Sequence, residues 1–378
     1  MRREAAIFSL GIGACYMQGQ TVLGAQPAQI DSVQWNVSSA DTGRVSSVAE
    51  IADDVVVFSD KGALVFAGGA LATVDGTVTA WQPVATSIPA ADGTGTWLVA
   101  VSTDGRLRRL RGRTALEDVS DRYGLAHTKV TGVASGGGAW SVFSTDTGLA
   151  ISDGVTVSLL DGALSGLVAG SHRAAGITAD GHVRVIDLRS RVGSDYAADH
   201  PVAVAFDAAG MLWVETAHKL YTENRGALDP VYEDSNTLHG LTFGGGRLWF
   251  AAGTSLGFAT KDAVMRAAVN LPFDATLFAS TTGDVWAVSQ GALSRYGVPV
   301  SGDEAHWRKS VLPVYARVCS QCHGPGGSSG IDLSTYGSWA ARRQDIYGRV
   351  FVQKTMPQNQ ALTADDSAAL QAWTQATP

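Results

Sequence analysis

The sequence predicts a chain of two folded parts, an all-β propeller of about seven blades followed by a small all-α domain. Three observations lead to this prediction: a strand–turn–strand pattern recurs over most of the chain, glycine is abundant while charges are few, and helical patterns replace strand patterns near Ser301. The 378 residues are enough for two domains. We expect the propeller within residues 30–300 and the helical domain within residues 305–378.

The repeat is clearest around three tryptophans, Trp213, Trp249 and Trp286. Each stands within a short apolar run that follows a glycine turn and precedes a second turn. Weaker copies extend toward the N-terminus, where Asp-Gly and Asp-x-Gly turns separate strand-like runs, a strong hairpin signal. From Gly62 to Gly291 the turns recur about every 38 residues, which is typical of a four-stranded propeller blade. We therefore predict seven blades, with six or eight as alternatives.

The composition agrees with stacked blades. Blades pack face to face, so their strands are apolar on both sides, and their tight turns favour glycine. The chain has 44 glycines, while charged residues make up only 17%. We expect Trp213, Trp249 and Trp286 to pack between blades rather than face a ligand. The Trp-centred copies resemble the propeller repeats in sensor domains of two-component regulators, at the level of repeat pattern.

The Cys-Ser-Gln-Cys-His run at residues 319–323 points most clearly to chemistry. Two thiols three positions apart can add to the two vinyl groups of one porphyrin, and the next imidazole can reach its iron. We predict Cys319 and Cys322 as thioether residues of one covalent haem c, and His323 as the proximal iron ligand with its other ring nitrogen held by backbone. The alternatives are a redox dithiol and part of a zinc site. A redox dithiol is expected within a βαβ pattern, which the surrounding sequence lacks. A zinc site needs four ligands, and His306 is the only additional candidate nearby in the sequence.

A second axial ligand to the iron is expected downstream. Met356 is the only methionine after residue 301, and Pro357 after it favours a loop rather than a helix. Met/His ligation raises the reduction potential relative to two imidazoles. We predict Met356 as this ligand. The alternatives for the second ligand are His306 or an open coordination position. Met356 would then have a purely structural role as a flexible side chain that fills the core.

Two predicted helices flank these residues. Residues 310–319 have the pattern of a helix with Pro313 in its first turn, where a missing N–H does no harm. A second helix begins after Thr363, in the manner of a capping box with Asp in place of Glu. Leu370 and Trp373 lie on one apolar face of that helix. Between the two helices we expect a turn, a short helical stretch and the loop with the methionine.

Residues 310–378 resemble a small class I cytochrome c domain, with an attachment motif after the first helix, a Met-Pro loop and a closing helix with an aromatic side chain. The resemblance implies a single-haem electron-transfer domain that uses Cys319, Cys322, His323 and Met356. The domain is shorter than many relatives, which implies an exposed haem edge.

These features predict a c-type cytochrome that carries single electrons to or from a redox protein partner or a respiratory-chain component. The propeller would be a scaffold or a module that recognises a glycan or a protein. The alternative is a propeller dehydrogenase with a quinone-type cofactor that reduces its own haem, which rests on analogy of architecture. The net charge of −7 argues against nucleic acid as a partner.

The start of the chain predicts export. A positively charged beginning and a short apolar run precede Cys15, and the run is too short to span a membrane. Residues 12–15 resemble a bacterial lipoprotein box, in which the cysteine becomes the lipidated first residue. The alternative is ordinary cleavage near Ala25. We predict an export segment and tether within residues 1–25, a lipid anchor on Cys15, and a location in the bacterial periplasm or on the outer cell surface.

Export and haem attachment support each other, because haem is attached to apocytochromes outside the cytoplasmic membrane. The segment from Gln18 to Ile30 has little periodic signal. We expect it to be a flexible tether between the anchor and the propeller.

Overall fold

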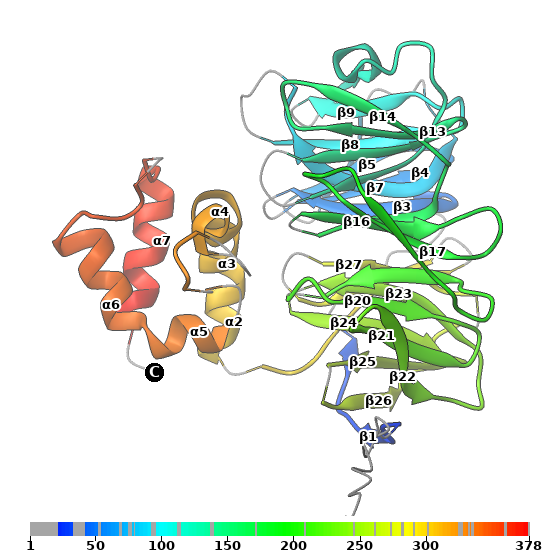
Figure 1. Cartoon of the computed structure of the whole chain (residues 1–378). Coiled ribbons are helices and arrows are strands. Elements are labelled where there is room, and N and C mark those ends of the chain that lie inside the picture. Colours follow the sequence, from blue (N-terminus) through cyan, green and yellow to red (C-terminus); the bar gives the residue numbers. More distant parts are fainter. Residues whose placement is uncertain are drawn as a thin grey trace, which may run out of the picture.

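The protein is described by a computed structural model, which covers most of the chain after residue 21. The described residues are 22–32, 42–51, 54–67, 70–74, 78, 80–91, 96–111, 115–136, 140–170, 172–207, 209–244, 246–260, 262–272, 274–280, 283–289, 292–300, 302–323, 328–331, 333, 336–358 and 361–376. Cys15 and the predicted leader lie outside them. Figure 1 shows a stack of sheets with a group of helices beside it.

Seven sheets form the blades of a propeller, which we name A to G in chain order of their inner strands. Blade A contains β3 (Val45–Ile51), β4 (Asp54–Ser59), β5 (Gly62–Ala67) and β6 (Ala70–Thr73). Blade B contains β7 (Trp81–Pro89), β8 (Thr96–Ser102), β9 (Leu107–Arg111) and β10 (Ala115–Asp118), followed by the 3₁₀ turn η1 (Ser120–Tyr123). Blade C contains β11 (Val130–Ser135), β12 (Ser141–Thr145), β13 (Gly148–Ser152) and β14 (Val157–Asp161). Blade D contains β15 (Ser165–Ala169), β16 (Arg173–Ile177), β17 (Val183–Asp187) and β18 (Gly193–Tyr196).

Two of the remaining three blades, F and G, include strands from the N-terminal part of the chain. Blade E contains β19 (Ala203–Phe206), β20 (Leu212–Glu215), β21 (Lys219–Asn224) and β22 (Ala227–Glu233). Blade F contains β23 (Leu238–Gly244), β24 (Arg247–Ala252), β25 (Ser255–Ala259) and β26 (Val264–Ala268), with β1 (Ala25–Pro27) as a fifth strand. Blade G contains β27 (Thr276–Ala279), β28 (Val285–Ser289) and β29 (Ala292–Gly297), with β2 (Asp31–Ser32) as its outer strand.

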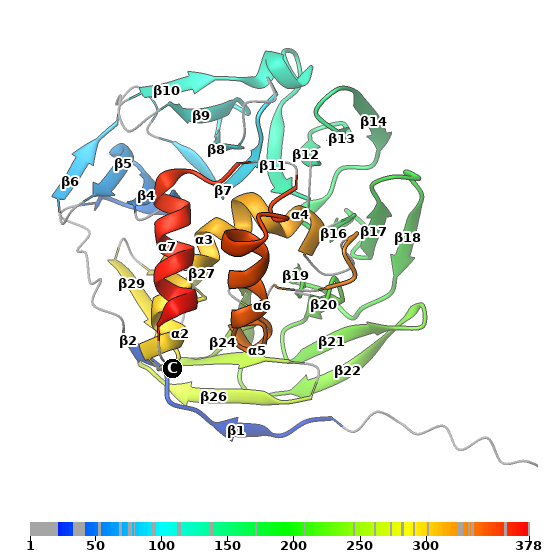
Figure 2. The ribbon, with the colours of Figure 1, turned by 90° about the vertical axis from the view of Figure 1, so that its left-hand side faces the viewer.

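The blades close into a ring, which Figure 2 shows from the side of the helices. Inner strands of neighbouring blades contact one another all the way round, including β27 of blade G and β3 of blade A. The last blade takes its fourth strand from the N-terminal part of the chain, since Asp31 pairs with Gly297 and Ser32 with Tyr296. The prediction of seven blades is therefore confirmed.

The predicted flexible tether is wrong for the residues between 22 and 30. The Leu23 N–H donates to the Val231 carbonyl at 2.7 Å, and β1 pairs in parallel with β26. The Ile30 side chain is only 7% exposed and belongs to an apolar cluster between blades F and G. The sequence did not show this, because a strand of three residues has no periodicity of its own.

The turns and the core follow from the repeat. Gly62 directly follows the turn between the second and third strands of its blade, and Gly105 and Gly181 lie within the corresponding turns. Their φ angles are 104°, 82° and 83°, in a region that favours glycine. The three repeated tryptophans are each 0% exposed on the second strands of blades E, F and G. Each indole belongs to an apolar cluster that includes a side chain of the following blade: Leu248 for Trp213, Leu277 for Trp249 and Val48 for Trp286. The prediction that they pack between blades is confirmed.

The C-terminal part is helical and lies beside one face of the propeller (Figures 1 and 2). A continuous helical run consists of α2 (Gly302–His306), the π-helical turn η2 (Trp307–Val311), α3 (Leu312–Val314), the π-helical turn η3 (Tyr315–Cys319) and α4 (Ser320–His323). It is followed by α5 (Tyr336–Ala341), α6 (Arg343–Tyr347), the π-helical turn η4 (Gly348–Val352) and α7 (Ala364–Gln375). We call residues 302–376 the helical unit. None of the helices in the described part of the chain is long and apolar enough to cross a membrane.

The first helix begins earlier than the sequence predicts. It begins at Gly302, so Pro313 lies inside the helical run rather than in its first turn. The π-helical turn η2 ends two residues before this proline. A wider turn is one way for a helix to accommodate a residue that lacks an N–H and crowds the preceding turn.

The closing helix matches its prediction. The Thr363 side chain accepts a hydrogen bond from the Asp366 N–H at 3.1 Å, so it is the N-cap of α7. Leu370 and Trp373 are buried, at 1% and 0% exposed. They join the apolar core of the helical unit, which consists of Trp307, Val311, Val314, Tyr315, Leu333, Trp339, Leu370 and Trp373.

Candidate functional site

The Cys-x-x-Cys-His motif lies at the end of the first helical run. Cys319 is the last residue of η3, and Cys322 and His323 belong to α4. All three side chains are half-buried, and both cysteines are free thiols. The Cys319 side chain packs at the edge of the apolar core of the helical unit, together with half-buried Phe351. The motif thus borders both the core and the surface.

The loop after α4 holds the His323 ring. Its Nδ1 atom lies 3.2 Å from the carbonyl oxygen of Ile331 and 3.0 Å from the Ser329 hydroxyl. The loop is fixed in turn, because the Ser329 hydroxyl donates to the Cys322 carbonyl at 2.8 Å and the Leu333 N–H donates to the His323 carbonyl at 2.7 Å. When the proton is on Nδ1, this nitrogen donates to the backbone and the lone pair of Nε2 is available to a metal.

The Cys319 thiol is unlike that of a redox dithiol. Burial raises its pKa to about 11, and the negative charges of Asp366 and ionised Cys322 act in the same direction. Redox-active and metal-bound cysteines depend on the thiolate, which a lowered pKa favours. The Cys319 thiol is therefore protonated at neutral pH, which argues against the dithiol alternative.

The zinc alternative also lacks support from the structure. A structural zinc site needs four ligands. Within the described part of the chain, no group of three or more His, Cys, Asp or Glu side chains is placed to hold a metal ion. His306, the one additional ligand that the sequence offers nearby, ends α2 at the other end of the helical run.

Some apolar side chains around the end of the first helical run and on η4 are exposed or only half-buried. The Ile331 side chain is 42% exposed, although its carbonyl contacts the His323 ring. Val352 is 67% exposed, and its neighbour Phe351 is half-buried at the edge of the core. A flat apolar group such as a porphyrin needs surfaces of this kind to cover. The residues present therefore fit a haem.

Met356 lies on the loop between η4 and α7, as the sequence predicts. Its N–H donates to the Arg349 carbonyl at 3.3 Å, and the neighbouring Thr355 N–H donates to the same oxygen at 2.9 Å. The Met356 side chain is half-buried and does not belong to the apolar core of the helical unit. It is thus a loop residue rather than a filler of that core.

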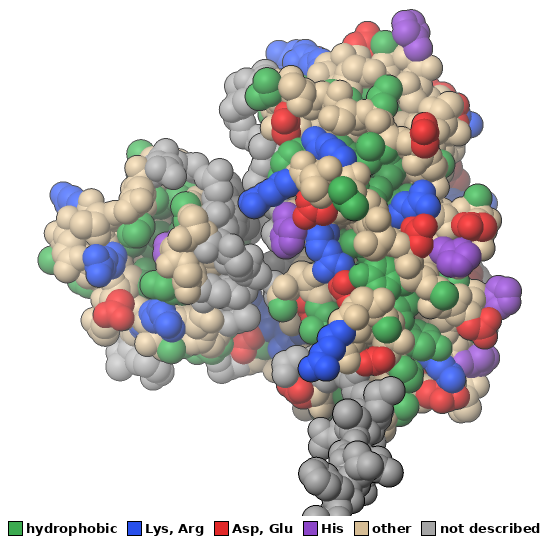
Figure 3. Space-filling model, in the orientation of Figure 1, with side chains coloured by type: hydrophobic (Ala, Val, Ile, Leu, Met, Phe, Trp, Pro, Cys, Tyr) green, Lys and Arg blue, Asp and Glu red, His purple; other side chains and the backbone are tan. Residues whose placement is uncertain are grey.

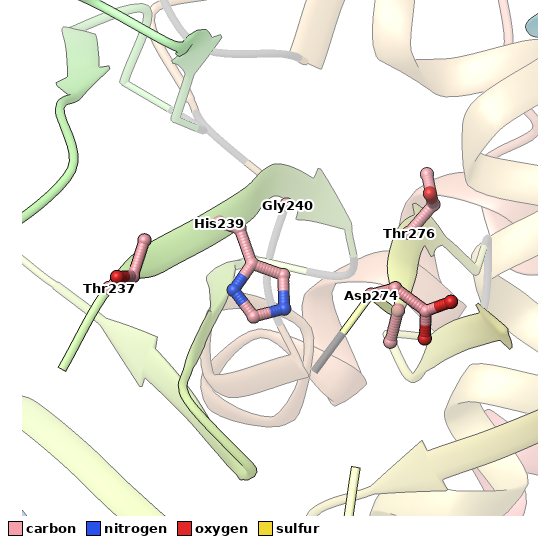
Figure 4. A pocket seen from close by; sticks show the side chains of 6 residues that line it. Thr237, His239, Gly240, Asp274 and Thr276 are labelled. Atoms are coloured by element: carbon pink, nitrogen blue, oxygen red, sulfur yellow. The ribbon is translucent and has the colours of Figure 1, made fainter. Parts of the chain in front are cut away.

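The propeller has a hollow of about 320 Å³ between blades F and G, at the start of their inner strands (Figure 4). His239 is half-buried, and burial lowers the pKa of its imidazole. Asp274 is exposed. The hollow is lined by Thr237, His239, Gly240, Asp274, Ala275 and Thr276. Sequence reasoning missed it because its residues come from two blades and share no motif.

Sequence reasoning also missed Glu215, a carboxyl group inside the propeller. Its side chain is 0% exposed, and neither carboxyl oxygen has a hydrogen-bond partner within normal geometry among the described residues. Burial raises the pKa of Glu215 to about 8, and the nearby Leu241 N–H offsets this only in part. The sequence did contain a signal for this group. Glu215 lies two residues after Trp213, and the equivalent positions in blades F and G are the apolar residues Ala251 and Val288.

Comparisons with known proteins support the propeller. No family model matches the chain, and no curated protein matches it. Among solved structures, the extracellular domain of the hybrid two-component system BT3049 from B. thetaiotaomicron has a TM-score of 0.54 and 14% identity over 71% of this chain and 41% of its own. The extracellular domain of the one-component system BT4673 from B. thetaiotaomicron has a TM-score of 0.52 and 10% identity over 70% and 43%.

A third structure is BBS1N, solved in complex with ARL6DN, with a TM-score of 0.54 and 12% identity over 73% of this chain and 99% of its own. At these identities the likeness shows the fold alone. This chain spans about two fifths of the BT3049 and BT4673 domains. The N-terminal part is a seven-bladed propeller similar in fold to extracellular domains of two-component regulators.

Proposed function

We propose that the protein is an exported c-type cytochrome that carries single electrons. The propeller is its scaffold or recognition module, and the helical unit holds one covalent haem. Cys319 and Cys322 form the thioether bonds, His323 is the proximal ligand and Met356 is the second axial ligand. The observation that carries this proposal is the position of His323, in the same helical run as both cysteines, with Nδ1 against a backbone carbonyl and Nε2 free of that contact.

The haem supplies an iron that cycles between Fe(III) and Fe(II) without a change of ligands. The protein chain orients the ligand and excludes water from the site. The Ile331 carbonyl and the Ser329 hydroxyl set the orientation of the imidazole, which a proximal ligand requires. The apolar side chains around Cys319 would exclude water from one side of a bound haem, and the exposed Ile331 side chain would offer it a further apolar surface.

The folded N-terminal segment favours lipidation of Cys15 over cleavage near Ala25. Cleavage after Ala25 would remove Leu23, whose N–H bonds blade E and whose side chain packs against the core between blades E and F. It would also cut within β1. Processing at Cys15 keeps the whole folded segment. The proposed location is the periplasm or the outer cell surface, with a lipid anchor.

The partners follow from the same proposal. A redox protein or a respiratory-chain component exchanges electrons with the haem. BBS1N, which is similar in fold, was solved with the protein ARL6DN. By this analogy the propeller recognises a protein, and a glycan is the other ligand class to test.

The test is production of the chain in a bacterial host that has a haem-attachment system. We expect purified protein to be red, to keep its haem under denaturing conditions and to gain the mass of one haem. The Cys322→Ser variant should retain at most one thioether bond, while His306→Ala should leave the spectrum unchanged. Colourless wild-type protein with free thiols at Cys319 and Cys322 would refute the proposal.

A second experiment addresses the axial ligand. Met356→Ala should abolish the weak far-red band of an iron–thioether bond and lower the reduction potential, because Met/His ligation raises it. Met265→Leu in strand β26 of the propeller is the matched control and should change neither. If Met356→Ala keeps the band and the potential, Met356 is not the ligand.

A further inference from the structure

The residues that follow the predicted anchor run along the outer rim of the propeller. Leu23 bonds the outer strand of blade E, β1 pairs with the outer strand of blade F, and β2 is the outer strand of blade G. We call residues 22–32 the rim strap. In Figures 1 and 2 β1 lies along one edge of the ring, on the side of blade F. The chain therefore leaves the folded protein at the rim, between blades E and F.

Little chain separates this point from Cys15. Eight Cα-to-Cα steps join Cys15 to Leu23, and a fully extended chain of that length reaches at most roughly 29 Å. A domain of about 270 residues has a radius of gyration of roughly 18 Å, so opposite rims lie roughly 40 to 50 Å apart. The tether is shorter than the propeller is wide.

We infer that the rim of blades E and F is the surface of this protein that faces the lipid bilayer, which rests on the proposed lipidation of Cys15. The rim strap fixes the tether to these two blades, and the short tether keeps them near the headgroups. Blade B lies opposite this rim in the seven-bladed ring, with blades A and C beside it, and these blades are held away from the bilayer. The partner of the E–F rim is thus a membrane surface, reached through acyl chains rather than through a basic patch.

The chemistry of the rim agrees with attachment by the tether. On the face drawn in Figure 3, acidic and basic side chains are interspersed over the propeller. On the outer strands of blade E, Lys219 pairs with Glu233 at 3.7 Å. A mixed rim gives no strong attraction to anionic lipids, for which clusters of Lys and Arg are needed. The orientation should therefore be the same on neutral and anionic vesicles.

The inference can be tested by energy transfer on the full-length lipidated protein in phosphatidylcholine vesicles whose headgroups carry an acceptor dye. An azide-bearing residue for donor coupling replaces either Asp262, in the turn before β26, or Leu159, which is 73% exposed on β14 of blade C. Each sample is normalised to the same labelled protein in vesicles without acceptor, which cancels quenching by haem. We expect transfer to be at least threefold more efficient from position 262 than from position 159.

A longer tether is the matched control. Insertion of thirty Gly and Ser residues after Met17 raises the greatest reach of the tether from roughly 29 to roughly 137 Å. We expect the difference between the two positions to shrink to less than half while the protein still floats with the vesicles. Equal transfer from both positions in the native-length protein, or a difference that the insertion does not reduce, would overturn the inference but not the lipid anchor.

The same samples report on the proposed anchor separately. The mass of the N-terminal peptide and flotation with vesicles show whether Cys15 carries acyl chains, and Cys15→Ser should abolish both signals. Absence of acyl chains from wild-type protein would overturn both the anchor and the orientation. Because neither measurement uses the haem, the result is independent of the proposed electron transfer.

Discussion

The buried carboxyl group of Glu215 makes the stability of the propeller depend on pH. Among the residues that the structure describes, no charged side chain offsets the burial of this group, and the Leu241 N–H lowers its pKa only in part. At neutral pH the folded protein therefore holds Glu215 as a neutral carboxylic acid. Replacement by Gln keeps the size of the side chain and removes the titration.

The sign follows from the two pKa values. The folded-state pKa of about 8 is above the ordinary value of 4.5, so the folded state retains a proton that the unfolded state releases as the pH rises between these values. The contribution of Glu215 to stability is fully present below about pH 4.5 and is lost as the pH rises to about 8. The difference between these two pKa values corresponds to at most about 5 kcal/mol of unfolding free energy.

Urea unfolding followed by far-ultraviolet circular dichroism between pH 4.5 and 9 measures this effect. We expect Glu215→Gln to be about as stable as wild type at pH 4.5 and up to about 5 kcal/mol more stable at pH 9. Glu233→Gln is the control, since this carboxylate lies in the same blade at 57% side-chain exposure and pairs only with Lys219 at 3.7 Å. It should change stability by less than about 0.5 kcal/mol at either pH.

An infrared spectrum gives a direct check of the protonation state. Wild-type protein at pH 7 should show the carbonyl band of a protonated carboxylic acid that Glu215→Gln lacks. If wild type and Glu215→Gln have the same pH dependence of stability, the side chain is ionised in the folded protein. The reasoning from burial would then be wrong.

Three further predictions concern single contacts. Thr363→Ala removes the N-cap of α7 and should lower the stability of the helical unit by about 1 kcal/mol, measured by thermal unfolding, with Thr363→Ser as a silent control. In folded protein without haem, Cys319 should react with iodoacetamide at pH 8 at least tenfold more slowly than a free cysteine, because its raised pKa leaves little thiolate; equal rates would show that the thiol is not buried. Glu50→Ala removes the carboxylate that accepts from the Trp286 indole and the Ser280 hydroxyl, both at 2.8 Å, across the seam between blades A and G, and should cost about 2 kcal/mol in urea unfolding.

The repeat made the propeller predictable from sequence. Trp213, Trp249 and Trp286 recur at one blade's spacing because each fills the same space between neighbouring blades. The turns at Gly62 and Gly105 recur because hairpins within a blade need residues that tolerate positive φ. A contact that repeats in every blade produces a periodic signal, and periodicity is what a single sequence reveals.

Ring closure and the buried carboxyl group were not predictable in the same way. The strand β2 closes the propeller through pairs such as Asp31 with Gly297, which occur once and join residues far apart in the chain. Glu215 does interrupt a repeated apolar position, but the strand pattern alone does not show that this position is buried on both sides. Its environment depends on the packing of blade F against blade E.

The helical unit contains both a feature that the local sequence shows and contacts that it does not show. The spacing of Cys319, Cys322 and His323 is a local chemical requirement of thioether attachment and is readable directly from the sequence. What orients the imidazole is not local to the motif, since Ile331 and Ser329 reach it only because the loop after α4 folds back and is bonded at Cys322 and His323. This loop bonds the ring through Nδ1 and so sets its orientation. Residues outside the motif thus orient the imidazole that we propose as the proximal ligand.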